Sequence, residues 1–239
     1  MRQYTLPPGA GLGILFLFGL LVFGLIFVPA HVAGESFERL GLTMLQGLVV
    51  LVCMLLWRGK SFIIHVSSRL VPQVAAQAMN AMLFRMQGME PESEHTGELV
   101  HQRIAVSVGG AVVPLCLCAY FAFRLSTHTN AWAWTAGVVA LVAVVCFAAL
   151  KPWPGQGLRL PVFLSPAATA VAAMVLRGQP FAPQAAYIAA VAGTLIGAGL
   201  APLVISRFRN RLDAPLLVIG GPGVFGGLFF ATIAAGLFA

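Results

Sequence analysis

Charged side chains are scarce in this sequence. Asp, Glu, Lys and Arg together make up 9% of the 239 residues, whereas hydrophobic residues make up 59%. In soluble globular domains the charged residues alone account for roughly a quarter. The composition therefore excludes an ordinary soluble domain and predicts an integral membrane protein.

Ionisable residues are also missing from the interior of every long apolar stretch. A helix needs about 20 apolar residues to cross a bilayer. Seven stretches approach or reach this length: 10–29, 40–57, 104–123, 131–150, 161–176, 185–206 and 216–238. Because ionisable groups at membrane depth mark proton relays and ion pathways, their absence argues against proton-coupled transport and acid–base catalysis within the membrane. The deepest polar residues are Gln46, Ser107, Thr135, Thr169, Thr194 and Thr232. The sequence shows no general base that could activate the hydroxyl of Ser107, so we favour a packing role for this residue over a role as a catalytic nucleophile.

The predicted fold is therefore an all-α, polytopic helical membrane protein with about seven transmembrane segments and a cytoplasmic N-terminus. The 161–176 stretch is short and begins with prolines, so it is either a full span or a re-entrant half-span. Seven spans would place 11 of the 14 Lys and Arg residues on one side, which the positive-inside rule makes cytoplasmic. We expect the first span to be retained, because 10–29 is longer than a signal-peptide core.

Three parts of the chain are distinguished by composition. Residues 1–57 are predicted to form a two-helix hairpin, and residues 104–239 a membrane bundle with broken, Gly/Pro-rich helices. Between them, 58–103 holds a predicted amphipathic helix from Pro72 to Met86 on the cytoplasmic interface, followed by an acidic linker. The formal net charge of +7 is explained by a basic rim facing anionic lipid and needs no nucleic-acid partner.

Candidate metal ligands are few. On the predicted amphipathic helix four methionines share one face, and soft sulfur ligands select Cu(I), although an adaptable apolar contact surface explains them more simply. These methionines are Met79, Met82, Met86 and Met89. Cys116 and Cys118 are two positions apart, which turns their thiols to opposite sides of a helix. No metal or other cofactor is required by the sequence.

Glycine and proline are concentrated where they should weaken a membrane helix. The stretch "GGPGVFGG" at 220–227 lies within an apolar run, and Pro222 predicts a break between Gly220 and Pro222. Gly193 and Gly197 in one segment, and Gly223 and Gly227 in the next, are each four residues apart, so we expect these two helices to pack closely against each other. Broken helices also form binding sites, so a ligand site and close packing both remain open here.

The motifs "VSVGGAVVP" at 106–114, "KPWPGQGLRLPVFLSP" at 151–166, "GTLIGAGL" at 193–200 and the segment from Asp213 onward resemble a family of multi-pass prokaryotic membrane proteins, domain of unknown function 1614. The resemblance covers roughly the C-terminal 60% of the chain and implies a location in the prokaryotic inner membrane, but no activity. The family usually has Asn at the position of Ser107 and Asp at the positions of Gly199 and Gly226. If those aspartates act in the family, this chain has lost their chemistry.

Three functions are compatible with these observations. The first is a non-catalytic accessory or scaffold subunit of a larger membrane assembly, which in one variant of this hypothesis also binds an apolar ligand. Its expected partners are membrane lipids and either other subunits or further copies of the same chain. The second is a carrier or channel for a small neutral or anionic solute. The third is a degenerate relative of an intramembrane hydrolase. The candidate residues for ligand binding or packing are Ser107, Gly193, Gly197, Gly199, Gly220, Gly221, Pro222, Gly223, Gly226 and Gly227.

Overall fold

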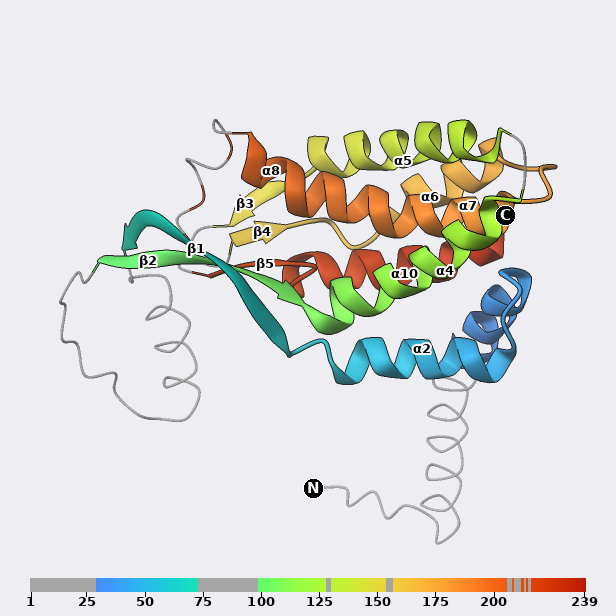
Figure 1. Ribbon diagram of the computed structural model, residues 1–239, viewed down its shortest axis with the longest axis horizontal. Coiled ribbons are helices and arrows are strands. Elements are labelled where there is room, and N and C mark those ends of the chain that lie inside the picture. Colours follow the sequence, from blue (N-terminus) through green and yellow to red (C-terminus); the bar gives the residue numbers. More distant parts are fainter. Residues whose placement is uncertain are drawn as a thin grey trace, which may run out of the picture.

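The computed structural model is a helical bundle with a small β-layer at one end (Figure 1). It describes residues 29–72, 99–127, 130–153, 157–205, 208, 212, 214 and 216–239. The helices are Pro29–Arg39, α2 (Met44–Leu56), α4 (Val113–Leu125), α5 (Ala131–Ala148), α6 (Leu164–Val175), α7 (Ala182–Ile188), α8 (Ala201–Val204) and α10 (Pro222–Phe238), with π turns η1 (Val108–Val112), η2 (Ala189–Gly193) and η3 (Ile196–Leu200).

Among the described residues, three helices are long and apolar enough to cross a membrane. They are Val108–Leu125, Ala131–Ala148 and Ala182–Val204; the helices Pro29–Arg39 and α2 make a fourth if this pair, bent by 116°, is one span. These apolar helices indicate a membrane protein. The predicted number of seven spans is not confirmed within the described residues, and the segment 10–29 lies outside them except for Pro29. Helix α6 has 12 residues and is roughly 18 Å long, which is too short for a bilayer core of about 30 Å.

The fold is mostly helical, as expected, but it is not all-α, because strands occupy parts of two predicted spans and part of 58–103. Strand β2 (Leu99–Ser107) lies between β1 (Ser61–Pro72) and β5 (Leu216–Ile219), antiparallel to the first and parallel to the second. Strands β3 (Lys151–Trp153) and β4 (Gly157–Arg159) form a separate two-stranded sheet. The predicted amphipathic helix therefore cannot begin at Pro72, which ends β1; its remainder, 73–86, and the acidic linker up to residue 98 lie outside the described residues.

The side chains of β2 explain why this segment is a strand. His101 and Arg103 are exposed while Gln102 between them is buried, the period-two alternation of a half-buried strand. The side-chain amide of Gln102 donates hydrogen bonds to the carbonyls of Leu212 (2.9 Å) and Ala214 (3.0 Å). The buried amide thus holds the segment before β5 against β2.

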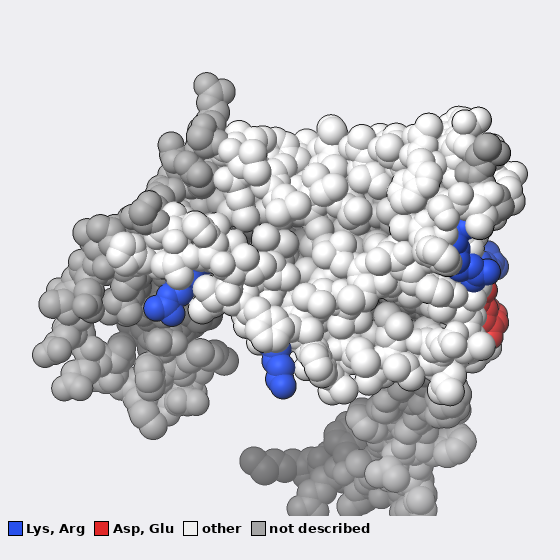
Figure 2. Space-filling view, in the orientation of Figure 1, with Lys and Arg blue, Asp and Glu red and all other residues white. Residues whose placement is uncertain are grey.

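Few charged side chains are visible on the face of the molecule in Figure 2. Lys and Arg lie beside the β-layer, on the lower edge between the two ends, and at the opposite end next to Asp or Glu; the surface over the helices above this edge is uncharged in this view. Arg124 lies in the last turn of α4 and Arg177 follows α6, both at the end of the bundle away from the β-layer. This distribution fits a bundle whose middle faces lipid.

The core of the bundle is packed around α5 and the continuous helix Ala182–Val204. A Cβ on Gly193 would lie 2.7 Å from Val142 Cβ, and a Cβ on Gly197 would overlap the carbonyl of Ala143. Both glycine positions are therefore in close contact with α5. They do not contact the glycines of α10. The expected packing of the two helices is confirmed, since α10 contacts α7 and η2. The glycine pairs do not form this contact, because the positions of Gly223 and Gly227 face the segment that includes β4 and the start of α6.

Candidate functional site

The chain passes from β5 into α10 through a turn of two glycines and a proline. Gly220 has a φ of +69°, a left-handed conformation that residues with a Cβ rarely adopt. The carbonyl of Gly221 accepts hydrogen bonds from the N–H groups of Val224 (2.9 Å) and Phe225 (2.8 Å). Pro222 occupies the first helical position. An N–H group there would have no partner within the helix, so the helix loses no hydrogen bond by having proline. The predicted break near Gly220 is therefore the change from strand to helix.

A second strand-to-helix turn follows β2 and uses a serine instead. The Ser107 hydroxyl accepts a hydrogen bond from the N–H of Gly110 (3.2 Å), which caps the helix that begins at η1. The same hydroxyl donates to the carbonyl of Arg58 at 3.4 Å. Ser107 thus links the helix start to the turn that follows α2.

The turn after α2 is bound closely to η1. The N–H of Val108 donates to the carbonyl of Lys60 (2.9 Å), and the N–H of Gly109 donates to the carbonyl of Trp57 (3.2 Å). A Cβ on Gly109 would overlap the carbonyl of Met54 near the end of α2. Only a glycine allows this approach of two backbones.

The two strand-to-helix turns contact each other through their glycines. A Cβ on Gly110 would overlap the carbonyl oxygen of Gly220, and a Cβ on Gly220 would lie 2.5 Å from the carbonyl oxygen of Gly110. Strands β2 and β5 run parallel and side by side, so their ends deliver both turns to one place. We call the two turns, 107–110 and 219–223, the glycine junction.

Strand β4 and the segment after it extend the glycine junction on its other side. A Cβ on Gly223 would overlap the carbonyl of Leu158, and the N–H of Leu160 donates to the carbonyl of Gly223 at 3.0 Å. The backbone after β4 thus lies directly against the first turn of α10. The "GGPG" sequence therefore provides a turn conformation at one glycine and close backbone contacts at its neighbours.

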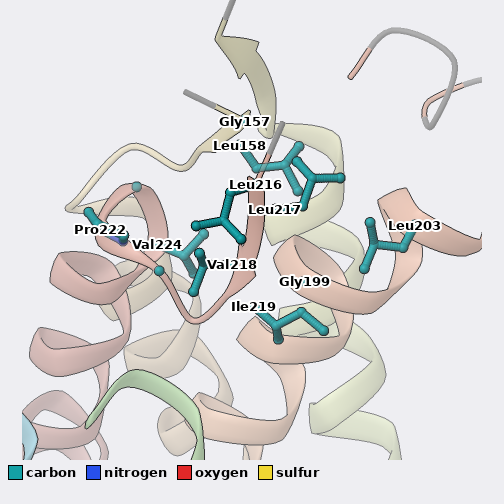
Figure 3. Close-up of a pocket in the computed structure, with 12 residues that line it drawn as sticks. Gly157, Leu158, Gly199, Leu203, Leu216, Leu217, Val218, Ile219, Pro222 and Val224 are labelled. Atoms are coloured by element: carbon teal, nitrogen blue, oxygen red, sulfur yellow. The ribbon is translucent and has the colours of Figure 1, made fainter. Parts of the chain in front are cut away.

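A small apolar pocket lies beside this junction and contains several of the residues that the sequence singled out (Figure 3). Its volume is about 50 Å³, which is room for a few water-sized groups. Aliphatic side chains from β5 and glycines from three elements line it. The lining residues are Gly157, Leu158, Gly199, Leu203, Leu216, Leu217, Val218, Ile219, Gly221, Pro222, Gly223 and Val224.

The two family aspartate positions differ in their surroundings. Gly199 in η3 lines the pocket, and a Cβ there would lie 2.9 Å from Ile219 Cγ2. Gly226 in α10 does not line it; a Cβ there would make ordinary contacts with Val162 at 3.6 Å. A side chain at Gly199 would therefore enter the pocket, whereas one at Gly226 would approach the segment before α6.

The structure also brings together polar residues that the sequence did not connect. The hydroxyls of Ser165 in α6 and Thr194 are 2.5 Å apart, and Cys146 Sγ lies 3.9 Å from the Thr194 hydroxyl. The buried hydroxyls of Thr169 and Tyr187 have no hydrogen-bond partner among the described residues. Ser165 was not among the candidates, because nothing in a single apolar run shows which hydroxyls from separate helices will meet.

The copper hypothesis is not tested by the structure. Met79, Met82, Met86 and Met89 lie outside the described residues. Within the described part of the chain, no group of three or more His, Cys, Asp and Glu side chains is arranged to hold a metal ion.

Comparison with known proteins identifies a family but no activity. No curated protein and no solved structure matches the chain. The family described as a protein of unknown function (DUF1614) matches residues 59–238. This match begins before β1 and includes both turns of the glycine junction and all residues that line the pocket. The chain therefore belongs to the DUF1614 family.

Proposed function

We propose that this protein is a non-catalytic subunit of a membrane assembly, and that the exposed face of α5 receives an apolar helix of a partner protein. The observation that carries the proposal is a groove on α5 with a glycine in its wall. The groove has a volume of about 430 Å³ and is lined by Ala133, Trp134, Gly137, Val138, Leu141 and Val175.

Helix α5 is the least covered of the three membrane-length helices. Only 28% of its span is buried, against 50% for Val108–Leu125 and 67% for Ala182–Val204. Its buried stripe, including Val138 and Val142, packs into the bundle, and the opposite side is exposed. This exposed side is the surface on which another membrane protein can pack without disturbing the bundle.

The small residues of that side favour a helix as the occupant. Ala133 and Gly137 are four residues apart, and no heavy atom lies within 4 Å of a Cβ built on Gly137. Small residues at this spacing let membrane helices approach closely, where packing and backbone contacts replace the hydrophobic drive that lipid does not provide. The bundle uses the same spacing at Gly193 and Gly197, which admit α5 itself.

The proposal is tested by gentle detergent extraction of the native membrane and mass determination of the complex that contains this chain. We expect a particle larger than the monomer, which is lost in Gly137→Leu because the larger side chain fills the groove. Val144→Leu is the matched control, since Val144 is exposed on the same helix but does not line the groove. A wild-type chain that migrates alone would contradict the proposal.

The pocket at the glycine junction supports a second candidate function, a carrier for a small solute. It lies at the break between β5 and α10, and its lining among the described residues is aliphatic or glycine, which favours a neutral over an anionic solute. Gly199→Leu should block the pocket and abolish flux of such a solute in liposomes, whereas Gly226→Ala should not. Equal flux in both variants would remove this candidate.

A further inference from the structure

A polar cavity lies at the end of the bundle away from the glycine junction. It is formed where α4 ends and α7 begins, and its volume is about 210 Å³. Its lining residues are Arg124, Leu125, Thr127, Pro180, Phe181 and Gln184. Unlike the groove on α5, this cavity presents a guanidinium and a side-chain amide to an occupant.

Arg124 has hydrogen-bonding capacity to spare. Its guanidinium carries five N–H donors. Among the described residues, the hydrogen bond that it makes is a long one of 3.5 Å from Nη1 to the carbonyl of Gly41. The remaining donors and the positive charge suit an acceptor that carries negative charge, and phosphate oxygens match the geometry of a guanidinium.

Gln184 requires the opposite partner. Its Nε2 donates to the carbonyl of Leu40 in a long hydrogen bond of 3.4 Å, which leaves the amide free to turn by a small angle. Its Oε1 is buried and has no hydrogen-bond partner among the described residues. Because an unsatisfied buried acceptor is costly, we expect the amide to turn its Oε1 toward a hydrogen-bond donor on the occupant.

The position of the cavity restricts the source of such a molecule. Arg124 is next to the last residue of the membrane-length helix Val108–Leu125, and Gln184 lies in the first turn of Ala182–Val204. Residues at the ends of membrane-spanning helices lie at the level of the lipid headgroups. A molecule with a phosphate and a nearby donor at this level is a phospholipid.

We infer that this cavity binds the headgroup of a phospholipid whose phosphate contacts Arg124 and whose amine or hydroxyl donates to Gln184. Ethanolamine and glycerol headgroups have such a donor, whereas choline has none. The inference is independent of the partner proposed for α5, because the two sites share no lining residue.

The test uses the full chain, purified and delipidated in a maltoside detergent, with short-chain phosphatidylethanolamine, phosphatidylglycerol and phosphatidylcholine as probes. Native mass spectrometry measures the bound lipid. We expect the ethanolamine and glycerol lipids to bind about tenfold more tightly than the choline lipid, since choline leaves the Gln184 oxygen unpaired. Equal binding of the three lipids would overturn the inference.

Two variants and one control identify the residues responsible. Arg124→Gln should weaken binding of all three lipids by about tenfold or more, because a charge-assisted bond to phosphate is lost. Gln184→Leu should remove the preference over choline while leaving choline binding unchanged. Arg177→Gln is the control, since Arg177 is an exposed arginine near the same end that does not line the cavity.

Inorganic phosphate separates a lipid site from an ion site. A headgroup site should bind inorganic phosphate far more weakly than the ethanolamine lipid, and millimolar phosphate should not displace that lipid. If phosphate alone binds as tightly, the cavity is a site for a free anion and the headgroup assignment is wrong. Unchanged lipid binding in a folded Arg124→Gln variant would also overturn it.

Discussion

The two turns of the glycine junction perform the same task with different chemistry. After β2, a serine hydroxyl caps the new helix, and the helix starts with the π turn η1. After β5, no side chain caps the helix; Gly220 in a left-handed conformation and Pro222 at the first helical position set its start. Each turn has a glycine whose missing Cβ makes room for the other turn. This glycine is Gly110 in the turn after β2 and Gly220 in the turn after β5.

This difference separates two roles of glycine. At Gly220 both the backbone conformation and the neighbouring carbonyl exclude a Cβ, whereas at Gly110 the neighbour alone excludes it. Substitutions at the two turns should therefore rank in a definite order, and the following predictions test that order.

The largest effect is expected for Gly220→Ala. A Cβ there would meet a left-handed φ and the carbonyl of Gly110, so we expect a loss of about 2–4 kcal/mol in unfolding free energy. Thermal unfolding in detergent would measure it. Gly59→Ala is the control, because no heavy atom lies within 4 Å of a Cβ at that position. Equal stability of the two variants would disprove the close contact.

Gly110→Ala should cost less, about 1–3 kcal/mol, because it overlaps the Gly220 carbonyl without straining its own backbone conformation. The same unfolding measurement applies, with Gly226→Ala as the control because a Cβ there makes ordinary contacts. A greater loss at Gly110 than at Gly220 would reverse the predicted order. The double variant should lose less than the sum of both, since the two turns share one contact.

Ser107→Ala removes the hydroxyl cap of the first turn, and we expect it to destabilise the protein by about 1 kcal/mol. Ser107→Asn should stay close to the wild-type stability, because asparagine is also a strong N-cap residue. If both variants lose the same stability, the hydroxyl acts through its bond to the Arg58 carbonyl and not as a cap.

The smallest effect is expected for Pro222→Ala. Proline at the first helical position restricts the unfolded chain without making a hydrogen bond, so its replacement should cost only about 0.4–1 kcal/mol. In thermal unfolding, this variant should have a higher unfolding temperature than Gly220→Ala and one close to that of Ser107→Ala. A collapse of stability would show that the proline ring makes a contact that the turn geometry does not indicate.

The helices of the bundle could largely be predicted from the sequence, whereas the strands could not. The 131–150 stretch contains α5, and 185–206 overlaps the helix Ala182–Val204. Strand β5 has four residues within the apolar stretch 216–238, and the last residues of β2 lie within 104–123. Short apolar runs of this kind do not show by periodicity whether they are strand or helix, and the sequence therefore predicts both as parts of spans.

The candidate site, too, could be predicted only in part from the sequence. The break near Gly220 could be predicted, because glycine and proline disfavour a helix wherever they occur. The contact between Gly110 and Gly220 could not, because it depends on β2 and β5 pairing in parallel, a long-range match that neither segment encodes alone. The sequence also could not predict that Gly193 and Gly197 contact α5, because this contact too depends on how distant segments pack.

The sequence by itself determined the class of this protein and the positions where its helices start or break. Composition, apolar length and the intrinsic conformations of glycine and proline are local properties, and they act whatever the neighbours are. The tertiary structure decided which glycines meet, which hydroxyls pair and which polar groups line a cavity. Those outcomes depend on the distances between segments far apart in the chain, and these are set only when the helices and strands pack.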